Sequence, residues 1–326
     1  MKKLFPAILL LLLCSAIFFA CNRPLGSVVY KNKTFSKKYD TPPGTIRIGE
    51  NFFADETELP NLYYREYLYW VSKVHGDSLF LESLPDTTVW NDELVFASPY
   101  VETYHQHPAF DMYPVVGLSH KQASDYLKWR SDRVYEMLLI EKGVIEPHFD
   151  QSADNYFSIE HYLSGNYFDY QPDTAAVPYI PKYRLPTEEE WEFLAGGGLD
   201  KSKYPYGFNT ESGRIYKIMN KKKNKNSKLY NLKFAHDPES DLNENITSPA
   251  PVTSFLPNDY GIYHTIGNLA EMTATPGIAK GGSFLHKKAE SSIANYQTYD
   301  KPTKWLGLRG VCTWETVATY LNPPLQ

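Results

Sequence analysis

The chain has 326 residues, 42% hydrophobic and 22% charged, so it is long enough to bury a large core as one large domain or two small ones. Its formal charge is −5, and −7 once the N-terminal Lys2 and Lys3 are removed, which argues against nucleic acid as the main partner. Aromatic residues reach 15%, including 26 tyrosines, a bias that suits irregular segments, a protein-binding face or a sugar-binding face.

The first 20 residues have the pattern of a bacterial lipoprotein signal peptide. Lys2 and Lys3 precede the apolar run 4–20, and Cys21 follows the small residue Ala20. Cleavage after residue 20 would leave Cys21 as a lipid-bearing first residue. The alternative is a transmembrane anchor, although a run of about 17 apolar residues is at the lower limit for spanning a bilayer.

Residues 21–41 are interpreted as the lipidated N-terminus and a tether. Between positions 22 and 43 there are five basic residues against the single acid Asp40, without an apolar period. A flexible chain of this length has an end-to-end distance of about 25 Å. Its lysines either contact anionic head groups or are simply solvated. Because Asn22 is not acidic and no acidic cluster follows Cys21, we expect an outer-membrane lipoprotein that faces the periplasm.

The cysteine count limits the chemistry of the mature chain. Cys14 is removed with the signal peptide and Cys21 is acylated, so Cys312 is the one remaining thiol. An internal disulfide, a two-cysteine redox centre and a bis-thiolate copper site are therefore excluded. Cys312 lies among apolar and aromatic neighbours, which favours a buried small side chain over a nucleophile.

A folded domain is predicted over residues 42–326. Residues 45–48 alternate like a strand after a Pro-Pro-Gly turn, and residues 61–71 have apolar side chains at helical spacing. Asn61 is a candidate cap for that helix, and Pro60 is well placed to separate the two elements.

A second pair of elements is predicted over residues 107–132. Val115 and Val116 indicate a short strand, and Ser119 is the predicted cap of a helix that continues through Ala123. His105 and His107 are two residues apart, so on a strand they would point to the same side, as metal ligands do. No third ligand stands at a recognisable spacing, which favours a structural role.

The segment 183–198 reads YRLPTEEEWEFLAGGG and predicts a helix that begins with a capping box. Thr187 is the cap, Glu190 completes the box, and Trp191 and Leu194 share one helix face. The three consecutive glutamates suit the start of a helix dipole better than a cation or acid-base site. Farther along, five lysines between positions 221 and 228 indicate a solvated loop, or a docking surface for an acidic partner.

The segment 258–283 reads NDYGIYHTIGNLAEMTATPGIAKGGS. With YRLPTEEEWEFLAGGG and the later Gly-Leu-Arg at 307–309, it resembles the sulfatase-modifying-factor, or formylglycine-generating-enzyme, superfamily. The resemblance implies an α+β formylglycine-generating-enzyme fold that is C-type-lectin-like and has much irregular structure. Active members oxidise a substrate cysteine with two cysteines after the Gly-Gly-Ser turn, and these places hold His286 and Ser291 here. A serine hydroxyl has a much higher pKa than a thiol and binds copper(I) poorly.

The same resemblance implies two structural calcium sites, bound by side-chain oxygens and backbone carbonyls. The residues in the places of the first site are Asn231, Leu232, Glu244 and Ile246. Those in the places of the second are Asn268 and Glu271, which are three apart and could equally cap a turn.

More narrowly, the segments DETELPNLYYREYLYW, LPDTTVW and HPAFDMYPVVGLSHKQASDYLKWRSDR resemble the gliding-motility lipoproteins K and J of the type 9 secretion machinery. Those relatives are noncatalytic components of periplasmic assemblies. The resemblance implies a lipid-anchored, catalytically degenerate protein with protein partners in an envelope assembly. Two alternatives stay open: an enzyme, which would need paired cysteines or a histidine set for iron, and a carbohydrate-binding module.

Overall fold

The computed structural model describes residues 38–91, 98–207, 248–254 and 257–321. The tether residues up to 37 and the lysines at 221–228 lie outside these ranges. The helices are α2 (Asn61–Val74), α3 (Asp77–Ser83), α4 (Ser98–Thr103), α5 (His120–Glu141), α6 (Ile159–Leu163), α7 (Glu188–Gly196) and α9 (Val317–Leu321). The strands are β1 (Thr45–Gly49), β2 (Phe52–Asp55), β3 (Tyr179–Arg184), β4 (Ala270–Met272), β5 (Ile278–Lys280), β6 (Tyr296–Thr298), β7 (Leu306–Gly307) and β8 (Val311–Thr316).

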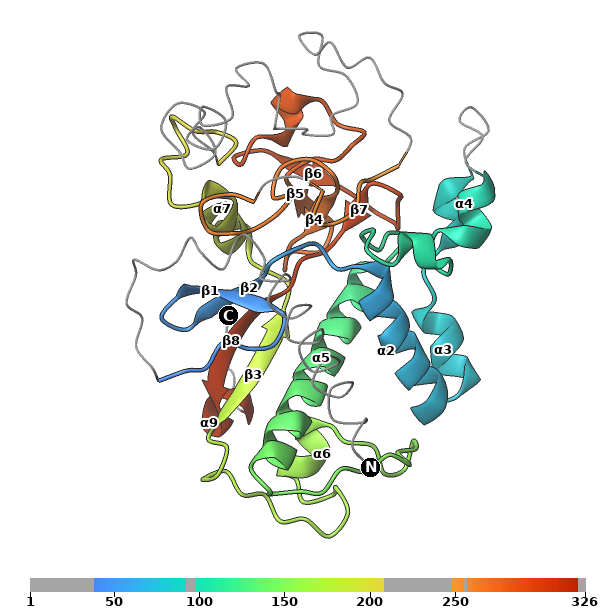
Figure 1. Ribbon diagram of the computed structural model, residues 1–326, viewed down its shortest axis with the longest axis vertical. Coiled ribbons are helices and arrows are strands. Elements are labelled where there is room, and N and C mark those ends of the chain that lie inside the picture. Colours follow the sequence, from blue (N-terminus) through green and yellow to red (C-terminus); the bar gives the residue numbers. More distant parts are fainter. Residues whose placement is uncertain (1–37, 92–97, 208–247, 255–256, 322–326) are drawn as a thin grey trace, which may run out of the picture.

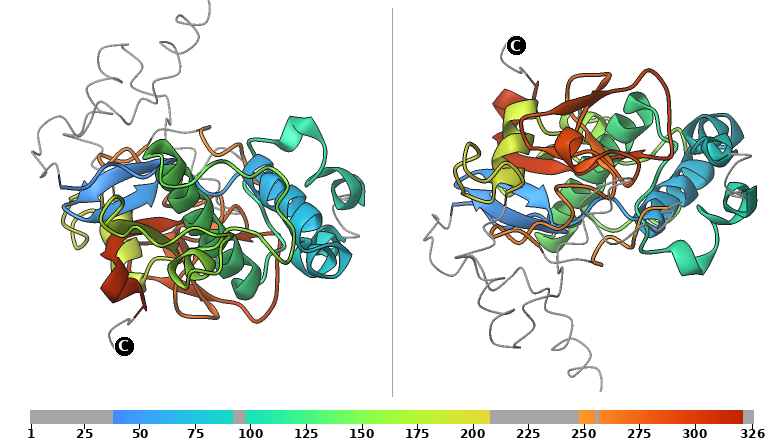
Figure 2. Two further views of the ribbon diagram at one scale, coloured as in Figure 1. Left: turned by 90° about the horizontal axis from the view of Figure 1, so that it is seen from below. Right: turned by 90° about the horizontal axis from the view of Figure 1, so that it is seen from above.

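The first sheet is antiparallel, with the strand order β1-β2-β8-β3. Helix α5 lies between this sheet and the α2 and α3 pair (Figures 1 and 2). Leu127 of α5, Tyr183 of β3 and Cys312 of β8 belong to the same hydrophobic core. The Ser131 hydroxyl accepts the Tyr183 N–H at 2.9 Å, which fixes α5 against the sheet.

The second sheet has the order β6-β5-β4-β7 and lies above the first in the view of Figure 1. β4 is antiparallel to β5 and parallel to β7. The strands have two or three residues each, so much of this half of the molecule is irregular backbone. The whole is an α+β fold.

Two predicted helix starts are confirmed. The Ser119 side chain accepts the Gln122 N–H while the Gln122 side chain accepts the Ser119 N–H, and Thr187 and Glu190 form the same reciprocal pair at α7. Glu190 also binds Arg184 through both carboxylate oxygens, which confirms a structural role for that acid. α7 ends where Gly197 adopts a left-handed conformation.

Two other predictions at this level are wrong. Pro60 rather than Asn61 precedes the first helical residue of α2, and the Asn61 amide instead donates to the carbonyls of Tyr104 and Phe110. Val115 and Val116 form no strand, since only an isolated bridge joins Pro60 to Pro114. The Val115 N–H donates to the Leu59 carbonyl at 2.8 Å, but the Leu59 N–H donates to the Leu308 carbonyl instead, so the ladder does not continue.

A second core cluster supports an irregular segment after α5. The Tyr135 and Leu139 side chains of α5 pack there with Phe157, Tyr162 and Tyr167, all of them essentially inaccessible to solvent. This segment closes the end of the molecule opposite the β4–β7 sheet (Figure 1).

Ordered contacts with the domain begin before residue 42. The Asp40 carbonyl accepts the Trp314 indole N–H at 2.8 Å, and the Tyr39 ring packs edge-on against Tyr179 at 5.0 Å. The last residues of the predicted tether are thus held against the first sheet.

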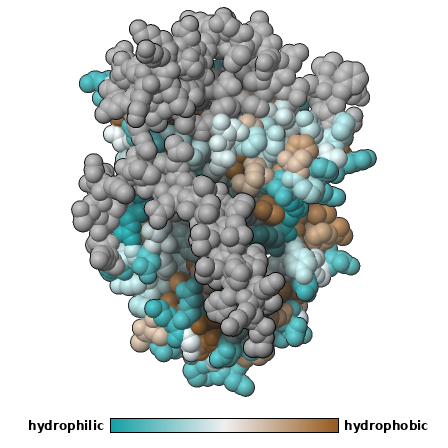
Figure 3. Space-filling model, in the orientation of Figure 1, coloured by the Kyte–Doolittle hydropathy of each residue, from teal (hydrophilic) through white to brown (hydrophobic). Residues whose placement is uncertain are grey.

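At the surface, hydrophobic residues are scattered among hydrophilic ones on the side of α2 and α3 (Figure 3). None of the described helices has both the length and the apolar character needed to cross a bilayer.

Candidate functional site

The Gly-Gly-Ser turn follows β5 and places the two degenerate catalytic positions beside the second sheet. Gly281 and Gly282 have φ values of 93° and 64°. A Cβ on Gly281 would lie 2.7 Å from the Thr265 carbonyl oxygen, and one on Gly282 would lie 1.9 Å from the Ser291 hydroxyl oxygen. Only glycine fits at these two positions, so the turn brings the backbone directly against Ser291.

His286 is half-buried and already has a hydrogen-bond partner. Its Nδ1 lies 2.7 Å from the Ser283 hydroxyl oxygen, and its ring stands edge-on to Trp305 at a centroid distance of 4.9 Å. Burial lowers the pKa of His286, while the nearby Glu290 opposes this shift. Through these contacts His286 joins the turn after the Gly-Gly-Ser segment to Trp305.

Ser291 is inaccessible to solvent. Its hydroxyl donates to the Lys287 carbonyl at 3.0 Å, within the short 3₁₀ helix that carries it. A substrate cysteine could not reach this hydroxyl without movement of the Gly281–Gly282 turn. Ser283 is equally buried, and its oxygen also accepts the Leu285 N–H, so the Ser283–His286 pair forms a turn rather than an exposed nucleophile.

Cys312 lies on the central strand β8 with no solvent exposure, which confirms the predicted buried thiol. Burial raises the pKa of this thiol well above its usual range. Because the thiolate is the reactive form, Cys312 is not suited to act as a nucleophile or a soft-metal ligand.

Beneath the turn lies a buried ion pair between Glu271 of β4 and Arg309. The Arg309 Nη2 is 2.6 Å from Glu271 Oε1, and the Trp191 indole donates to Glu271 Oε2 at 2.7 Å. The guanidinium also donates to the carbonyls of Asp55 and Tyr263. Arg309 thereby ties β2, β4 and the segment before β8 into one unit.

Glu58 is a second fully buried acid, and the sequence reasoning gave it no role. It accepts hydrogen bonds from the Asn268 amide at 2.7 Å and from the Leu269 N–H at 3.0 Å. Burial and then the charge of Glu271 raise the pKa of Glu58 well above its usual range. The His264 Nδ1 lies 3.6 Å from the same carboxylate. The neighbouring residues Thr57 and Leu59 in the sequence give no warning of partners some 210 residues away.

The second predicted calcium site does not fit a cation as the side chains stand. The Asn268 side-chain oxygen accepts the Ala250 N–H at 2.7 Å, and the Glu271 carboxylate is neutralised by Arg309. A cation there would face a guanidinium at close range. Asn268 has a φ of 60°, a conformation that asparagine tolerates, so its role is that of a turn residue.

The first predicted calcium site, at Asn231, Leu232, Glu244 and Ile246, lies outside the described residues. Within the described ranges, no group of three or more histidine, cysteine, aspartate and glutamate side chains is arranged to hold a metal ion.

His105 and His107 do not lie on a strand, so the condition under which they would share a side as metal ligands is not met. The His105 Nδ1 lies 3.2 Å from the Asn61 side-chain oxygen, and the His107 Nδ1 accepts the Ala109 N–H. Burial, with the charge of Arg65 adding to it, lowers the pKa of His105 to about 4.

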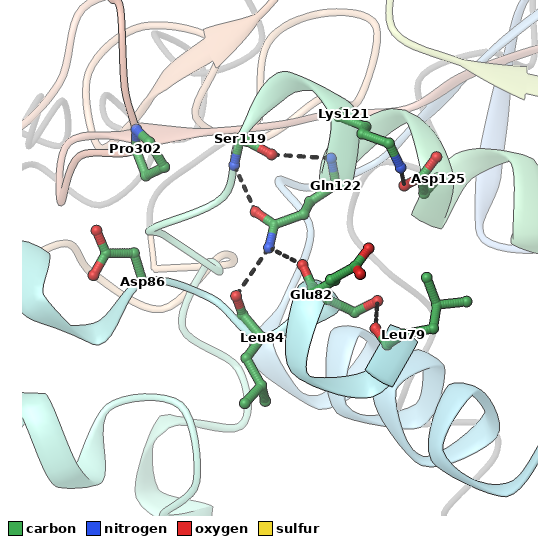
Figure 4. A pocket seen from close by; sticks show the side chains of 10 residues that line it. Leu79, Glu82, Leu84, Asp86, Ser119, Lys121, Gln122, Asp125 and Pro302 are labelled. Atoms are coloured by element: carbon green, nitrogen blue, oxygen red, sulfur yellow. Dashed lines mark hydrogen bonds and ion pairs between the residues drawn. The ribbon is translucent and has the colours of Figure 1, made fainter. Parts of the chain in front are cut away.

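A pocket of about 310 Å³ lies between α3 and the start of α5, and sequence patterns gave no sign of it (Figure 4). The Gln122 amide donates to the carbonyls of Glu82 and Leu84 across its wall. Lys121 pairs with Asp125 at 2.7 Å. The rest of the lining consists of Leu79, Ser83, Asp86, Ser119 and Pro302. Among its polar groups, Gln122 thus joins the end of α3 to the start of α5.

Comparison with known proteins identifies the family of this chain. The sequence model of the sulfatase-modifying factor enzyme 1-like domain family matches residues 23–314. The formylglycine-generating enzyme of Thermomonospora curvata is 34% identical over 129 residues, which cover 31% of this chain and 38% of that protein. The inactive C-alpha-formylglycine-generating enzyme 2 of Bos taurus is 42% identical over 94 residues, which cover 28% of this chain and 26% of that protein.

The chain therefore spans less than two fifths of the length of these curated relatives, which include both an enzyme and a protein named as inactive. Among solved structures, the Treponema denticola variable protein 1 is similar at 17% identity, with a TM-score of 0.40 and coverage of 80% of this chain and 84% of that one. With the family match extending over most of the sequence, the chain belongs to the sulfatase-modifying factor enzyme 1-like domain family.

Proposed function

We propose that this protein is a lipid-anchored, catalytically degenerate member of its family that acts as a structural or interaction component of an envelope assembly. The observation that carries the proposal is the state of Ser291. At the place of a catalytic cysteine there is a hydroxyl without solvent exposure that donates to the Lys287 carbonyl. His286, at the place of the other catalytic cysteine, is hydrogen-bonded to the Ser283 hydroxyl.

The proposed location is the periplasmic face of the outer membrane, through acylation of Cys21. The proposed partners are components of gliding-motility or type 9 secretion machinery. The resemblance that supports them includes residues 55–70, which contain most of α2 and contribute Leu59, Tyr64 and Tyr67 to the hydrophobic core.

The partner proposal is tested by affinity purification of the tagged native lipoprotein from crosslinked membranes. We expect recovery of secretion or gliding components in stoichiometric amounts. A Cys21→Ser variant at matched abundance is the control for anchoring, and it should lose most of this recovery. If the native lipoprotein recovers no protein partner, the proposed role in an assembly is contradicted.

The enzyme alternative is tested separately. Purified protein loaded with copper(I) is incubated with a cysteine-containing sulfatase peptide, and the product is analysed by mass spectrometry. We expect no conversion of the peptide cysteine to an aldehyde, with an active formylglycine-generating enzyme as the positive control. Aldehyde formation above the protein-free rate would contradict the proposed loss of catalysis.

The pocket in Figure 4 does not favour the carbohydrate alternative. Its lining combines carboxylates with aliphatic groups and contains no aromatic ring on which a sugar could stack.

A further inference from the structure

The irregular segment after α5 carries a concentration of negative charge. Residues 141–176, which we call the acidic lobe, contain seven acidic residues and one lysine, a net charge of −6. The whole chain has a charge of −5, so everything outside the acidic lobe sums to +1. The acids are all exposed: Glu141, Glu146, Asp150, Asp154, Glu160, Asp169 and Asp173. Glu160 pairs with Lys128, and within the described residues the other six form no ion pair.

Aromatic side chains project from the same surface. Phe149 is 88% exposed, the highest value of any large hydrophobic side chain in the described ranges. Phe168 is 41% exposed, and its ring stacks on the His148 imidazole at a centroid distance of 4.2 Å and an interplanar angle of 18°. We call the stacked His148–Phe168 pair, together with the exposed Phe149 that follows His148 in the sequence, the aromatic face. Asp150 and Asp169 flank these residues in the sequence.

Hydrogen bonds and core packing hold the backbone around this face in place. The Tyr170 hydroxyl accepts the Glu146 N–H at 3.0 Å and lies 3.3 Å from the His148 Nε2. Tyr167, next to Phe168, is buried in the second core cluster. Phe168 has a φ of 48°, in the left-handed region that bulky residues rarely adopt, and this turn directs Tyr167 inward and leaves Phe168 outside. The His148–Phe168 part of the aromatic face is thus fixed by packed structure.

We propose that the aromatic face of the acidic lobe docks an arginine- or lysine-rich segment of a protein partner. Exposed carboxylates attract such a segment and steer its approach. Guanidinium and ammonium groups are also attracted to the faces of aromatic rings, and their aliphatic stems cover apolar surface. Carboxylates and rings on one surface select for the same side chains. The inference rests on the proposed function, because it names the surface and the partner chemistry of that assembly role.

The test places a photo-crosslinking benzoylphenylalanine at position 149 of the full-length lipoprotein in its native cells. The matched control carries the same group at Tyr69 of α2, which is 63% exposed and lies outside the acidic lobe. We expect a protein crosslink at 149 whose mapped partner peptide contains several arginines or lysines, and at least a fivefold lower yield at 69. Exposed charges are screened at high ionic strength, so the yield at 149 should also fall when membranes are irradiated in about 0.5 M salt.

Two variants in the crosslinking background separate recognition from folding. Phe168→Asn removes the ring and supplies a residue that tolerates positive φ, so the backbone is retained. Asp150→Asn with Asp169→Asn removes two charges at nearly constant shape. Each should lower the yield at least threefold while leaving the thermal unfolding midpoint unchanged or higher.

A crosslink only to lipid, a partner peptide without basic residues, or unchanged yield in both variants would overturn the inference. If the affinity purification still recovers assembly components in those cases, the proposed function stands and only the docking surface is wrong. If the purification recovers none, the proposed function fails on its own measurement.

Discussion

At the residue scale, the two degenerate positions differ in how they meet solvent. His286 is half-buried in a loop, whereas Ser291 is covered by the Gly281–Gly282 turn. A cysteine introduced at position 291 would therefore be shielded, and one introduced at position 286 would be open to reagents. The structure shields position 291 from solvent more completely than position 286, which the two substitutions in the sequence do not indicate.

This difference can be measured with a thiol reagent in a background that carries Cys14→Ser and Cys21→Ser. We expect Ser291→Cys to react in the native state no faster than the buried Cys312 of the background. His286→Cys should react at least tenfold faster, and unfolding in denaturant should make all thiols reactive. Rapid native-state labelling at position 291 would show that the turn opens readily, against the argument from burial.

Arg309 offers a second test at this scale. Arg309→Met strands the Glu271 charge in the core, so we expect a loss of about 3–5 kcal/mol in the free energy of unfolding. Adding Glu271→Leu removes the stranded charge and should restore part of that loss. The measurement is denaturant unfolding followed by circular dichroism. A double variant that is less stable by the full sum of both single losses would mean that the two residues do not act as a pair.

At the scale of elements, Asp132 joins α5 to the start of α6. Its Oδ1 accepts the Ile159 N–H at 2.9 Å. Burial raises the pKa of Asp132 to about 6, against the lowering effect of that hydrogen bond. The folded state therefore holds the proton on Asp132 more tightly than the unfolded state, in which the pKa of this carboxyl is about 4. The stability linked to this proton is fully present below that lower value and is lost as the pH rises through about 6.

Asp132→Asn keeps the acceptor oxygen and removes the titration. We expect the variant to equal the wild type near pH 4 and to exceed it by about 2–3 kcal/mol at pH 7. Unfolding by urea across this range measures the difference between the two proteins. A difference that stays flat with pH would contradict the raised pKa.

The elements also show which features the sequence could predict. The starts of α5 and α7 depend on residues three apart, Ser119 with Gln122 and Thr187 with Glu190, so local pattern was sufficient. The supposed strand at Val115 and Val116 depended on whether a partner could form a ladder, and the Leu59 N–H that would continue it donates to the distant Leu308 instead. In the site, the glycine turn was readable, whereas the burial of Ser291 and the contacts of Glu58 arise from tertiary packing between remote segments.

At the scale of the whole molecule, the predicted anchor sets a further expectation. The mature wild-type protein should begin at Cys21 and carry acyl chains, and Cys21→Ser should keep residues 1–20 and lack the lipid mass. Intact-protein mass spectrometry of the membrane fraction compares the two. An unmodified N-terminus in the wild type, or a different first residue, would contradict the lipoprotein prediction.

The order of strands in the first sheet has a consequence for how the protein is made. β8 lies between β2 and β3, yet along the sequence it is the last of the described strands. Until residues 311–316 have left the ribosome, β2 and β3 have no strand to join them, and the sheet cannot be completed. Such distant pairing slows folding, because the sheet cannot close until its last strand is available. A chain truncated before Val311 would lack the strand on which the rest of the sheet is assembled.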